Sequence, residues 1–531
     1  MQKWNALGGF LVVCLAVSTA FGQTQEDMQG KLQNLEKRLA AVEAENATLK
    51  SQVGDQGDEA LETQINSLLD RYAGTTVNSV ANPITMTGEF RFRNYWQSGD
   101  GDTSFGFNPF NPFNPKTGIS PSAFDDELDG SYSDALVRLG FMYEFTGDVT
   151  AYAEVQAHWN YGDLTSSTNG FFPSPLATGS AHGESLTPVT LHQGWVEVRN
   201  LFDRPELSSK TGRQEIALGN QFQFGDADWY SGWSFDGSVW TWDDESFTLT
   251  GIMARLSSLD RDLNQIPSYL SSHDDDELYS IYFTLKTIEN HELDLYWIYV
   301  NGHGVLTSIG SLGNGVGNAA VFGSFTAYYH TIGARIGGTF PDIVDGLDWN
   351  AEIAFQFGDV KGATFTGVSD VSGTAIEAEV GVMFDRDNML RAFVRVLWVE
   401  GPDGSDSGYI PLYPTRHSNS GFRARYGIFD LMPMSNVFSL QGGLHFNPDP
   451  QWTLGATVVW ATTDEATLVG VPGVDDDYGW ELDVWGEYRF TEQLTFGAGV
   501  AFLFPDDEGQ ILWALDDGTH VLIYMQARLV F

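Results

Sequence analysis

Apolar positions recur at every second residue along the last thirteen residues of the chain, 519–531. Ile523, Met525 and Leu529 fall on one face of an extended strand, and Arg528 falls on the other. A period of two with one apolar and one polar face predicts a strand that has an apolar medium on one side and water on the other. An amphipathic edge strand of a soluble sheet would show the same pattern, so the number of similar segments decides between them.

The same alternation recurs from residue 84 to residue 531. Each segment has roughly ten residues, the length that a tilted membrane-spanning strand requires. The eighteen predicted strands are 84–97, 133–145, 149–161, 189–200, 211–224, 235–243, 247–257, 277–288, 291–301, 325–338, 348–358, 374–384, 389–399, 434–446, 451–462, 478–490, 494–504 and 519–531.

The lengths of the connections follow the strand number. Connections after even-numbered strands are short, as at 146–148 and 491–493, whereas those after odd-numbered strands are long, as at 98–132 and 400–433. Outer-membrane barrels sort their loops in this way, with short turns in the periplasm and long loops outside. We therefore predict an all-β transmembrane barrel of about 18 antiparallel strands over residues 84–531. The even count places both barrel ends in the periplasm.

The two faces of the predicted strands support this fold. In 133–145, the apolar residues Leu139 and Phe141 would point outward, while Arg138 and Glu144 would point inward. Such charged inner faces predict a water-filled lumen, because a barrel of this strand number encloses an aqueous channel.

Composition excludes several other classes of protein. Hydrophobic residues make up 42% of the chain and its mean hydropathy is -0.18, which is too polar for a helical membrane protein. Aromatic residues reach 14%, as expected where aromatic girdles mark both membrane interfaces. The formal net charge of -44 argues against nucleic acid as a partner, since phosphate binding needs a basic surface.

The N-terminal part of the chain follows different patterns. Residues 1–22 carry an apolar run and small residues at the expected cleavage position, and they are predicted to be a signal peptide. Its Cys14 is the only cysteine, so the mature chain would form no disulfides. Residues 23–72 show an apolar heptad pattern that predicts a periplasmic α-helical coiled coil, trimeric or dimeric. A helix on the periplasmic mouth of the barrel is the alternative, and 73–83 is a linker.

Arginines are the leading candidates for contact with a solute. Sorted by strand phase, nine of them point into the predicted lumen, where rings of arginine select anions. Alternatively, they pair with inward acids such as Glu352 and Glu379 and only brace the wall. The nine are Arg91, Arg93, Arg138, Arg213, Arg335, Arg391, Arg395, Arg489 and Arg528.

The remaining candidate sites carry weaker signals. Acidic runs in the long loops, such as 125–127 and 506–508, could bind Ca²⁺, but their spacing is not that of a calcium-binding loop, and solvated loop charge is the simpler interpretation. No His is paired with a plausible nucleophile, so we predict no enzyme and no cofactor. In 421–426, Arg423 and Arg425 predict either a lumen plug or the outer part of a strand.

The stretch 212–219 reads GRQEIALG, and Asp-Trp and Phe-Asp-Gly follow it. It resembles the motif of the alginate-export outer-membrane porins, and the resemblance covers the barrel only. It implies an eighteen-stranded monomeric barrel that passes polyuronate through an arginine-rich constriction gated by loops, with Arg91, Arg93, Arg138 and Arg213 at the constriction. The motif residues are Gly212, Arg213, Gln214, Glu215, Gly219, Asp228, Trp229, Phe235, Asp236 and Gly237.

These observations predict a channel in the outer membrane of a Gram-negative-type bacterium, with the N-terminal helix in the periplasm. It would pass polysaccharide or other anionic solutes. A general diffusion porin for small solutes is one alternative, and a structural tether to the cell wall is another. The expected partners are outer-membrane lipids, the barrel assembly machinery, which reads a terminal aromatic residue such as Phe531, and further copies of the chain through the coiled coil.

Overall fold

The computed structural model describes part of the chain. The predicted signal peptide, coiled coil and linker, residues 1–83, lie outside the described residues, and so do most of the long connections. The described residues are 84–531 without 100–129, 163–188, 227–228, 230–231, 256–276, 303–325, 342–345, 362–369, 386–389, 404–405, 416, 418–424, 431–433, 466–476, 508 and 511–516.

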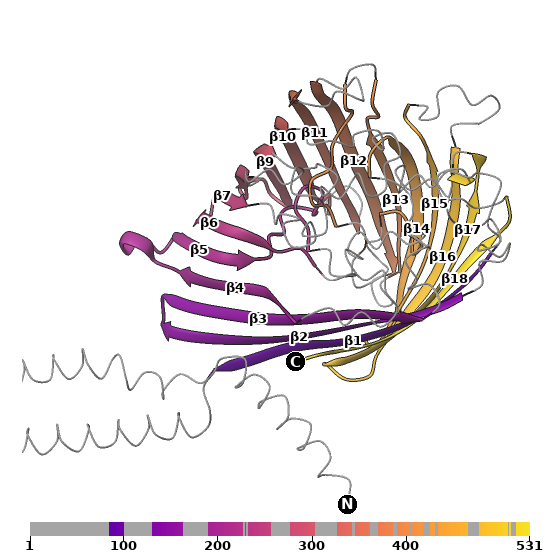
Figure 1. The fold of residues 1–531 in the computed structure, drawn as a ribbon, viewed down its shortest axis with the longest axis horizontal. Coiled ribbons are helices and arrows are strands. Elements are labelled where there is room, and N and C mark those ends of the chain that lie inside the picture. Colours follow the sequence, from indigo (N-terminus) through magenta and orange to yellow (C-terminus); the bar gives the residue numbers. More distant parts are fainter. Residues whose placement is uncertain are drawn as a thin grey trace, which may run out of the picture. The chain divides into compact units, whose positions relative to one another are not determined.

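Eighteen antiparallel strands form one sheet in chain order, and the last strand pairs with the first, which closes the barrel (Figure 1). The sequence predicted this fold correctly. The strands are β1 (Thr85–Ser98), β2 (Gly130–Thr146), β3 (Val149–Gly162), β4 (Thr190–Val198), β5 (Leu207–Gln214), β6 (Phe235–Asp243), β7 (Phe247–Arg255), β8 (Glu277–Leu285), β9 (His291–Gly302), β10 (Thr326–Thr339), β11 (Leu347–Lys361), β12 (Asp370–Asp385), β13 (Leu390–Val399), β14 (Val437–Asp449), β15 (Trp452–Thr462), β16 (Asp477–Arg489), β17 (Leu494–Pro505) and β18 (His520–Val530).

The terminal residue Phe531 takes part in the closure of the barrel. Its backbone exchanges two hydrogen bonds with Gly88 of β1, at 2.9 and 3.0 Å. The Phe531 ring stacks on the outward-facing ring of Phe90, with 5.9 Å between the centroids. The C-terminal aromatic therefore completes the seam between the first and last strands.

The connections keep the predicted relation between length and strand number. Those after even-numbered strands are short, and the longest of them, 199–206, contains only the 3₁₀ turn η3 (Leu201–Asp203). The predicted strand 211–224 was wrong after its first four residues, because β5 spans Leu207–Gln214. The described residues of 215–234 instead leave the wall, and they are named the β5–β6 segment below.

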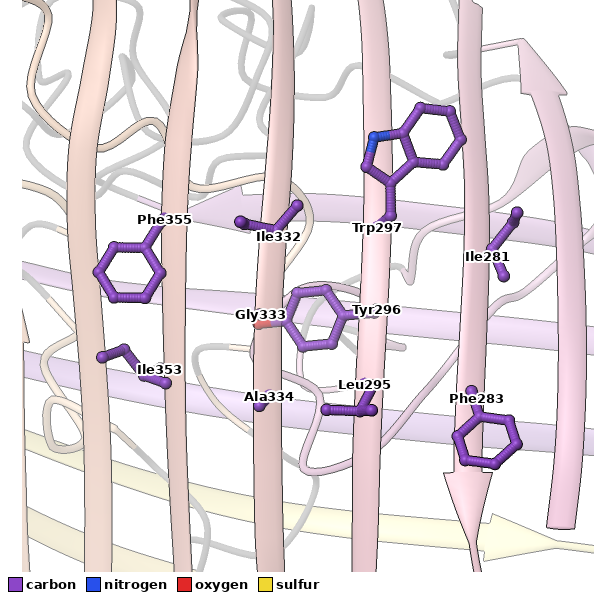
Figure 2. Close-up of a pocket in the computed structure, with 10 residues that line it drawn as sticks. All are labelled: Ile281, Phe283, Leu295, Tyr296, Trp297, Ile332, Gly333, Ala334, Ile353 and Phe355. Atoms are coloured by element: carbon purple, nitrogen blue, oxygen red, sulfur yellow. The ribbon is translucent and has the colours of Figure 1, made fainter.

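The outer surface is apolar, as membrane contact requires. Across β8 to β11 it forms a shallow groove of about 490 Å³, lined by outward residues that include Leu295, Ile332 and Phe355. Figure 2 shows these apolar side chains on neighbouring strands, with Tyr296 beside Gly333. A Cβ at position 333 would lie 2.2 Å from the Tyr296 ring, so glycine leaves room for that ring.

None of the described residues belongs to a helix that is long and apolar enough to cross a membrane.

Two connections fold into the barrel and contact each other inside it. They are the β5–β6 segment and the described residues of 400–436, named the β13–β14 segment. Their buried aromatic residues, such as Phe224 and Tyr413, pack with inward tyrosines of the wall into one hydrophobic cluster. At this level the inner face of the wall is therefore covered by packed side chains of the two segments, which the prediction of a water-filled lumen did not include.

Candidate functional site

The β5–β6 segment leaves and re-enters the wall at one narrow point. There, Arg213 of β5 makes a two-pronged ion pair with Asp236 of β6, at 2.7 and 2.5 Å. Gly212 has a φ of +130°, and a Cβ there would lie 2.2 Å from the Gly194 carbonyl oxygen, so only glycine fits. A Cβ on Gly237 would be equally crowded by the wall. We call Gly212, Arg213, Asp236 and Gly237 the neck.

Further motif residues tie the first part of the segment to the wall. Gln214 donates hydrogen bonds from its side-chain amide to the carbonyl oxygens of Lys210 and Gly237. Glu215 accepts a 2.8 Å hydrogen bond from His192, and Arg138 lies 3.6 Å from the same carboxylate oxygen. Arg138 is thus occupied by the segment rather than presented to an open lumen.

Trp229 connects the same segment to strands β1 and β18 of the wall. Its ring lies 3.6 Å from the Arg93 guanidinium, and its carbonyl oxygen accepts a short hydrogen bond from that group. The ring also stacks on His417 of the β13–β14 segment at 3.8 Å and meets Tyr524 of β18 edge-on at 5.2 Å. Trp229 therefore joins both inward segments to the seam of the barrel.

The β13–β14 segment is held to the wall by a buried arginine. Arg425 makes a double hydrogen bond to Glu377 of β12, at 3.0 and 3.2 Å. It also donates to the carbonyl oxygens of Asn220, at 2.9 Å, and of Thr415. Burial alone would lower the pKa of Arg425, but Glu377, together with Glu352 and Tyr426, raises it above its usual value, so the guanidinium stays charged.

The two inward segments also bind each other directly. Phe224 and Tyr413 form an isolated parallel β-bridge. Tyr409 donates a 3.0 Å hydrogen bond to the Gln223 side chain, and Gln356 of β11 binds the backbone of Ile410 in both directions. Burial and the nearby Glu352 carboxylate raise the pKa of the Tyr409 hydroxyl, so it keeps the proton that it donates. The segments therefore behave as one packed unit.

A polar pocket of about 360 Å³ lies between these segments and the wall strands β10 to β14. Arg391 is the second residue of β13, which follows a short turn, and His445 lies four residues before the end of β14. The pocket therefore lies on the short-turn side of the segments. It is lined by Gly219, Asn220, Gln221, Arg335, Asn350, Glu377, Glu379, Arg391, Phe393, Arg395, Thr415, Arg425 and His445.

Each wall arginine of the pocket is paired with carboxylates. Arg335 binds Asp294 at 2.6 Å, and it also forms an ion pair with Glu292. Arg391 and Arg395 both bind Glu379, each at 2.6 Å. The wall of the pocket is therefore a network in which guanidinium donors and carboxylate acceptors alternate.

The nine predicted arginines thus fall into different places. Three of them, Arg335, Arg391 and Arg395, meet in the pocket. Arg91, Arg93 and Arg138 have the predicted inward direction but are buried. Arg213 lies in the neck, Arg528 binds Glu89 at 2.8 Å, and Arg489 is exposed near the short turn after β16.

Other functional residues were missed or misplaced by the sequence. Gly219, Asn220 and Gln221 line the pocket, whereas the sequence placed them in a wall strand. Gly219 has a φ of +57°, which suits a turn. A glycine inside the predicted strand was the signal in the sequence that the strand could end there. Arg425 was a predicted plug residue and does lie in the lumen, whereas Asp228 of the motif falls outside the described residues.

No group of three or more His, Asp or Glu side chains is placed to hold a metal ion in the part of the chain that the structure describes. Most of the acidic runs considered for Ca²⁺ lie outside that part.

The sequence model described as Alginate export matches residues 136–505. The chain belongs to the alginate export family. The matched residues of this alginate export protein contain the neck, both inward segments and the pocket, whereas β1 and β18 lie outside the match. With its membrane-facing barrel, the protein is an outer-membrane transport channel.

Solved porins align with most of the chain at low sequence identity. A BenF-like porin from Pseudomonas fluorescens Pf-5 aligns with 13% sequence identity and a TM-score of 0.49, covering 84% of this chain and 99% of the porin. Pseudomonas aeruginosa OprD aligns with 11% identity and a TM-score of 0.46, covering 84% and 95% of the two chains. No curated protein sequence matches the chain.

Proposed function

We propose that this channel passes an anionic polysaccharide of the polyuronate type through the outer membrane. The observation that carries the proposal is the pocket in which Arg335, Arg391 and Arg395 gather beneath the inward segments. Guanidinium groups bind carboxylates through paired hydrogen bonds, which gives both affinity and orientation. Membership of the alginate export family supports the same class of solute.

The acids of the pocket also fit such a solute. A polyuronate carries hydroxyl donors beside each carboxylate, so it needs acceptors as well as cations along its path. Glu377 and Glu379 supply carboxylate acceptors, and Asn350 adds an amide. A wall of alternating donors and acceptors can therefore exchange its internal hydrogen bonds for bonds to the passing chain.

A general porin for small solutes is the second candidate, because every wall arginine of the described pocket already has a carboxylate partner. Such pairing lowers the attraction for anions, and it would suit small neutral solutes. The tether hypothesis concerns residues 23–72, which lie outside the described part of the chain.

The two candidates differ in how the channel responds to an oligosaccharide. We would insert the full-length protein into planar bilayers and measure block of the single-channel current by a hexameric oligouronate and by neutral maltohexaose. The proposal predicts stronger block by the oligouronate, weakened about tenfold in Arg395→Gln, because one charge-assisted hydrogen bond is worth about 1.5–3 kcal/mol.

Equal block by the two sugars would contradict the polyuronate proposal and favour the general porin. Arg199→Gln is the matched control. Arg199 lies in the short connection after β4, outside the pocket, and it pairs only locally with Glu197 at 3.4 Å and with Thr150. It should leave the oligouronate block unchanged.

A further inference from the structure

Glu379 occupies a distinctive position between two arginines of the pocket. Its Oε1 lies 2.6 Å from Nη2 of Arg391, and its Oε2 lies 2.6 Å from Nη2 and 2.8 Å from Nε of Arg395. One carboxylate thus holds both guanidinium groups, with one oxygen on each. We call the pair Arg391 and Arg395 the two-arginine site.

The two-arginine site does not depend on Glu379 alone. Arg391 is also held by both oxygens of Asp348 of β11, at 2.9 and 2.5 Å. Arg395 also donates to Gln441 of β14 at 2.9 Å. Without the Glu379 carboxylate, both guanidinium groups would still be oriented, and the space between them would suit another carboxylate.

Glu379 is also accessible enough to be displaced. It lines the pocket, and its side chain keeps 18% exposure, whereas the Glu377 side chain that binds Arg425 keeps only 4%. Both carboxylates line the pocket, but Glu377 is held by Arg425 and is nearly buried, so Glu379 is the more accessible of the two. A carboxylate that enters the pocket meets Glu379 at the two-arginine site.

From this geometry we propose that Glu379 is a specificity-determining residue, a built-in carboxylate that occupies the two-arginine site until a solute carboxylate displaces it. This inference rests on the proposed passage of an anionic polysaccharide. Conduction requires binding that is favourable enough for entry but weak enough for release. An internal competitor lowers the net affinity of a strong two-arginine site to that range, so that a uronate unit exchanges rather than stays bound.

The test compares Glu379→Gln, Glu379→Asp and the parent channel in planar bilayers. The probe is free glucuronate, a single carboxylate on a sugar, and the readouts are its blocking constant and the reversal potential in a KCl gradient. In Glu379→Gln the blocking constant should fall about tenfold, since the loss of one charged competitor frees charge-assisted hydrogen bonds. The reversal potential should shift toward chloride.

Two variants separate displacement from a change of charge. Asp348→Asn removes the same charge beside Arg391 but leaves Glu379 in place, so it should give no tighter block. Glu379→Asp keeps the charge but shortens the side chain that spans both arginines, so it should give an intermediate gain. The inference would be overturned if glucuronate block tightened equally in Glu379→Gln and Asp348→Asn. It would also be overturned if block in Glu379→Gln were unchanged or weaker.

The oligouronate arm tests the proposed function separately. If glucuronate blocks Glu379→Gln more tightly while the hexameric oligouronate and maltohexaose block the parent channel equally, the role of Glu379 stands and the polyuronate proposal fails. The opposite result is selective block by the oligouronate that weakens in Arg395→Gln, with no tighter glucuronate block in Glu379→Gln. In that case the polyuronate proposal stands and the proposed role of Glu379 fails. Retention of the heat-modifiable barrel band on gels establishes that each variant is folded.

Discussion

Replacing Trp229 tests how the inward segments are held inside the barrel. The side chain is 3% exposed and contacts Arg93 of the wall, Tyr524 of the wall and His417 of the other segment. Truncation of a buried tryptophan to alanine costs about 3–5 kcal/mol, and a desolvated cation–π contact is worth about 2 kcal/mol of such a sum. Because these contacts join the segments to the wall, their loss should lower the free energy of local opening of the segments.

Native-state hydrogen exchange measures that opening directly. A loss of about 3 kcal/mol raises the opened population by a factor of ~100, so amide protection in both segments should fall by that factor in Trp229→Ala. Protection in β10 and β11 should not change. Trp229→Phe, which keeps an aromatic ring, should lose much less. Trp480→Ala, which truncates a half-exposed outward tryptophan, is the control.

The reasoning would be refuted by unchanged protection in the segments of Trp229→Ala. An equal loss of amide protection in the wall strands would also refute it, because Trp229 would then stabilise the whole barrel rather than the segments alone.

Three further substitutions address the wall, the neck and the seam. Glu481 and Asp483 of β16 are both 1% exposed, and Glu481 Oε2 and Asp483 Oδ1 lack hydrogen-bond partners among the described residues. Glu481→Gln supplies an amide donor and leaves one buried acid instead of two, so the free energy of unfolding should stay unchanged or rise by up to about 2 kcal/mol. The midpoint temperature of thermal unfolding on gels measures this. The same change at Glu89, which binds two arginines, should lower it, and a lower midpoint for Glu481→Gln would contradict this account. Gly212→Ala should cost more than about 2 kcal/mol of folding free energy because of the positive φ and the adjacent carbonyl, and it should lower the folded fraction after refolding into detergent. A wild-type yield would refute the steric argument. Phe531→Ala should slow barrel assembly in cells by removing the aromatic of the closing seam, and an unchanged assembly rate would count against that role.

The barrel wall was predictable because its signal is local. Alternation with a period of two follows from the pleat of each strand, and it requires no knowledge of neighbouring strands. The same property explains the error at β5. Ile216, Phe222 and Phe224 alternate with polar residues just as a wall strand does, yet they are buried inside the lumen against the other segment. Alternation indicates that one face of a segment is apolar, but it does not show whether that face contacts lipid or a hydrophobic core inside the lumen.

The site was predictable only in part, because its chemistry depends on partners distant in sequence. The inward direction of Arg391 and Arg395 followed from strand phase, but their pairing with Asp348 and Glu379 depends on the register of three strands. Arg93 was predicted to meet the solute, yet Trp229, 136 residues away in sequence, covers it. Inward arginines and inward acids were both visible in the sequence. Which of them remain accessible depends on the two segments that fold over the wall.

The position of the family motif now has a physical explanation. Gly212, Arg213, Asp236 and Gly237 form the neck, Glu215 and Trp229 fix the segment to the wall, and Phe235 packs under Tyr413. These residues hold the β5–β6 segment across the lumen, and that segment in turn carries Gly219 to Gln221 to the pocket. Under the proposed function, the motif would build the boundary of the solute path, and the arginines and acids of β10 to β13 would select the charge of the solute. A channel could keep the motif and change its solute through substitutions in those strands alone.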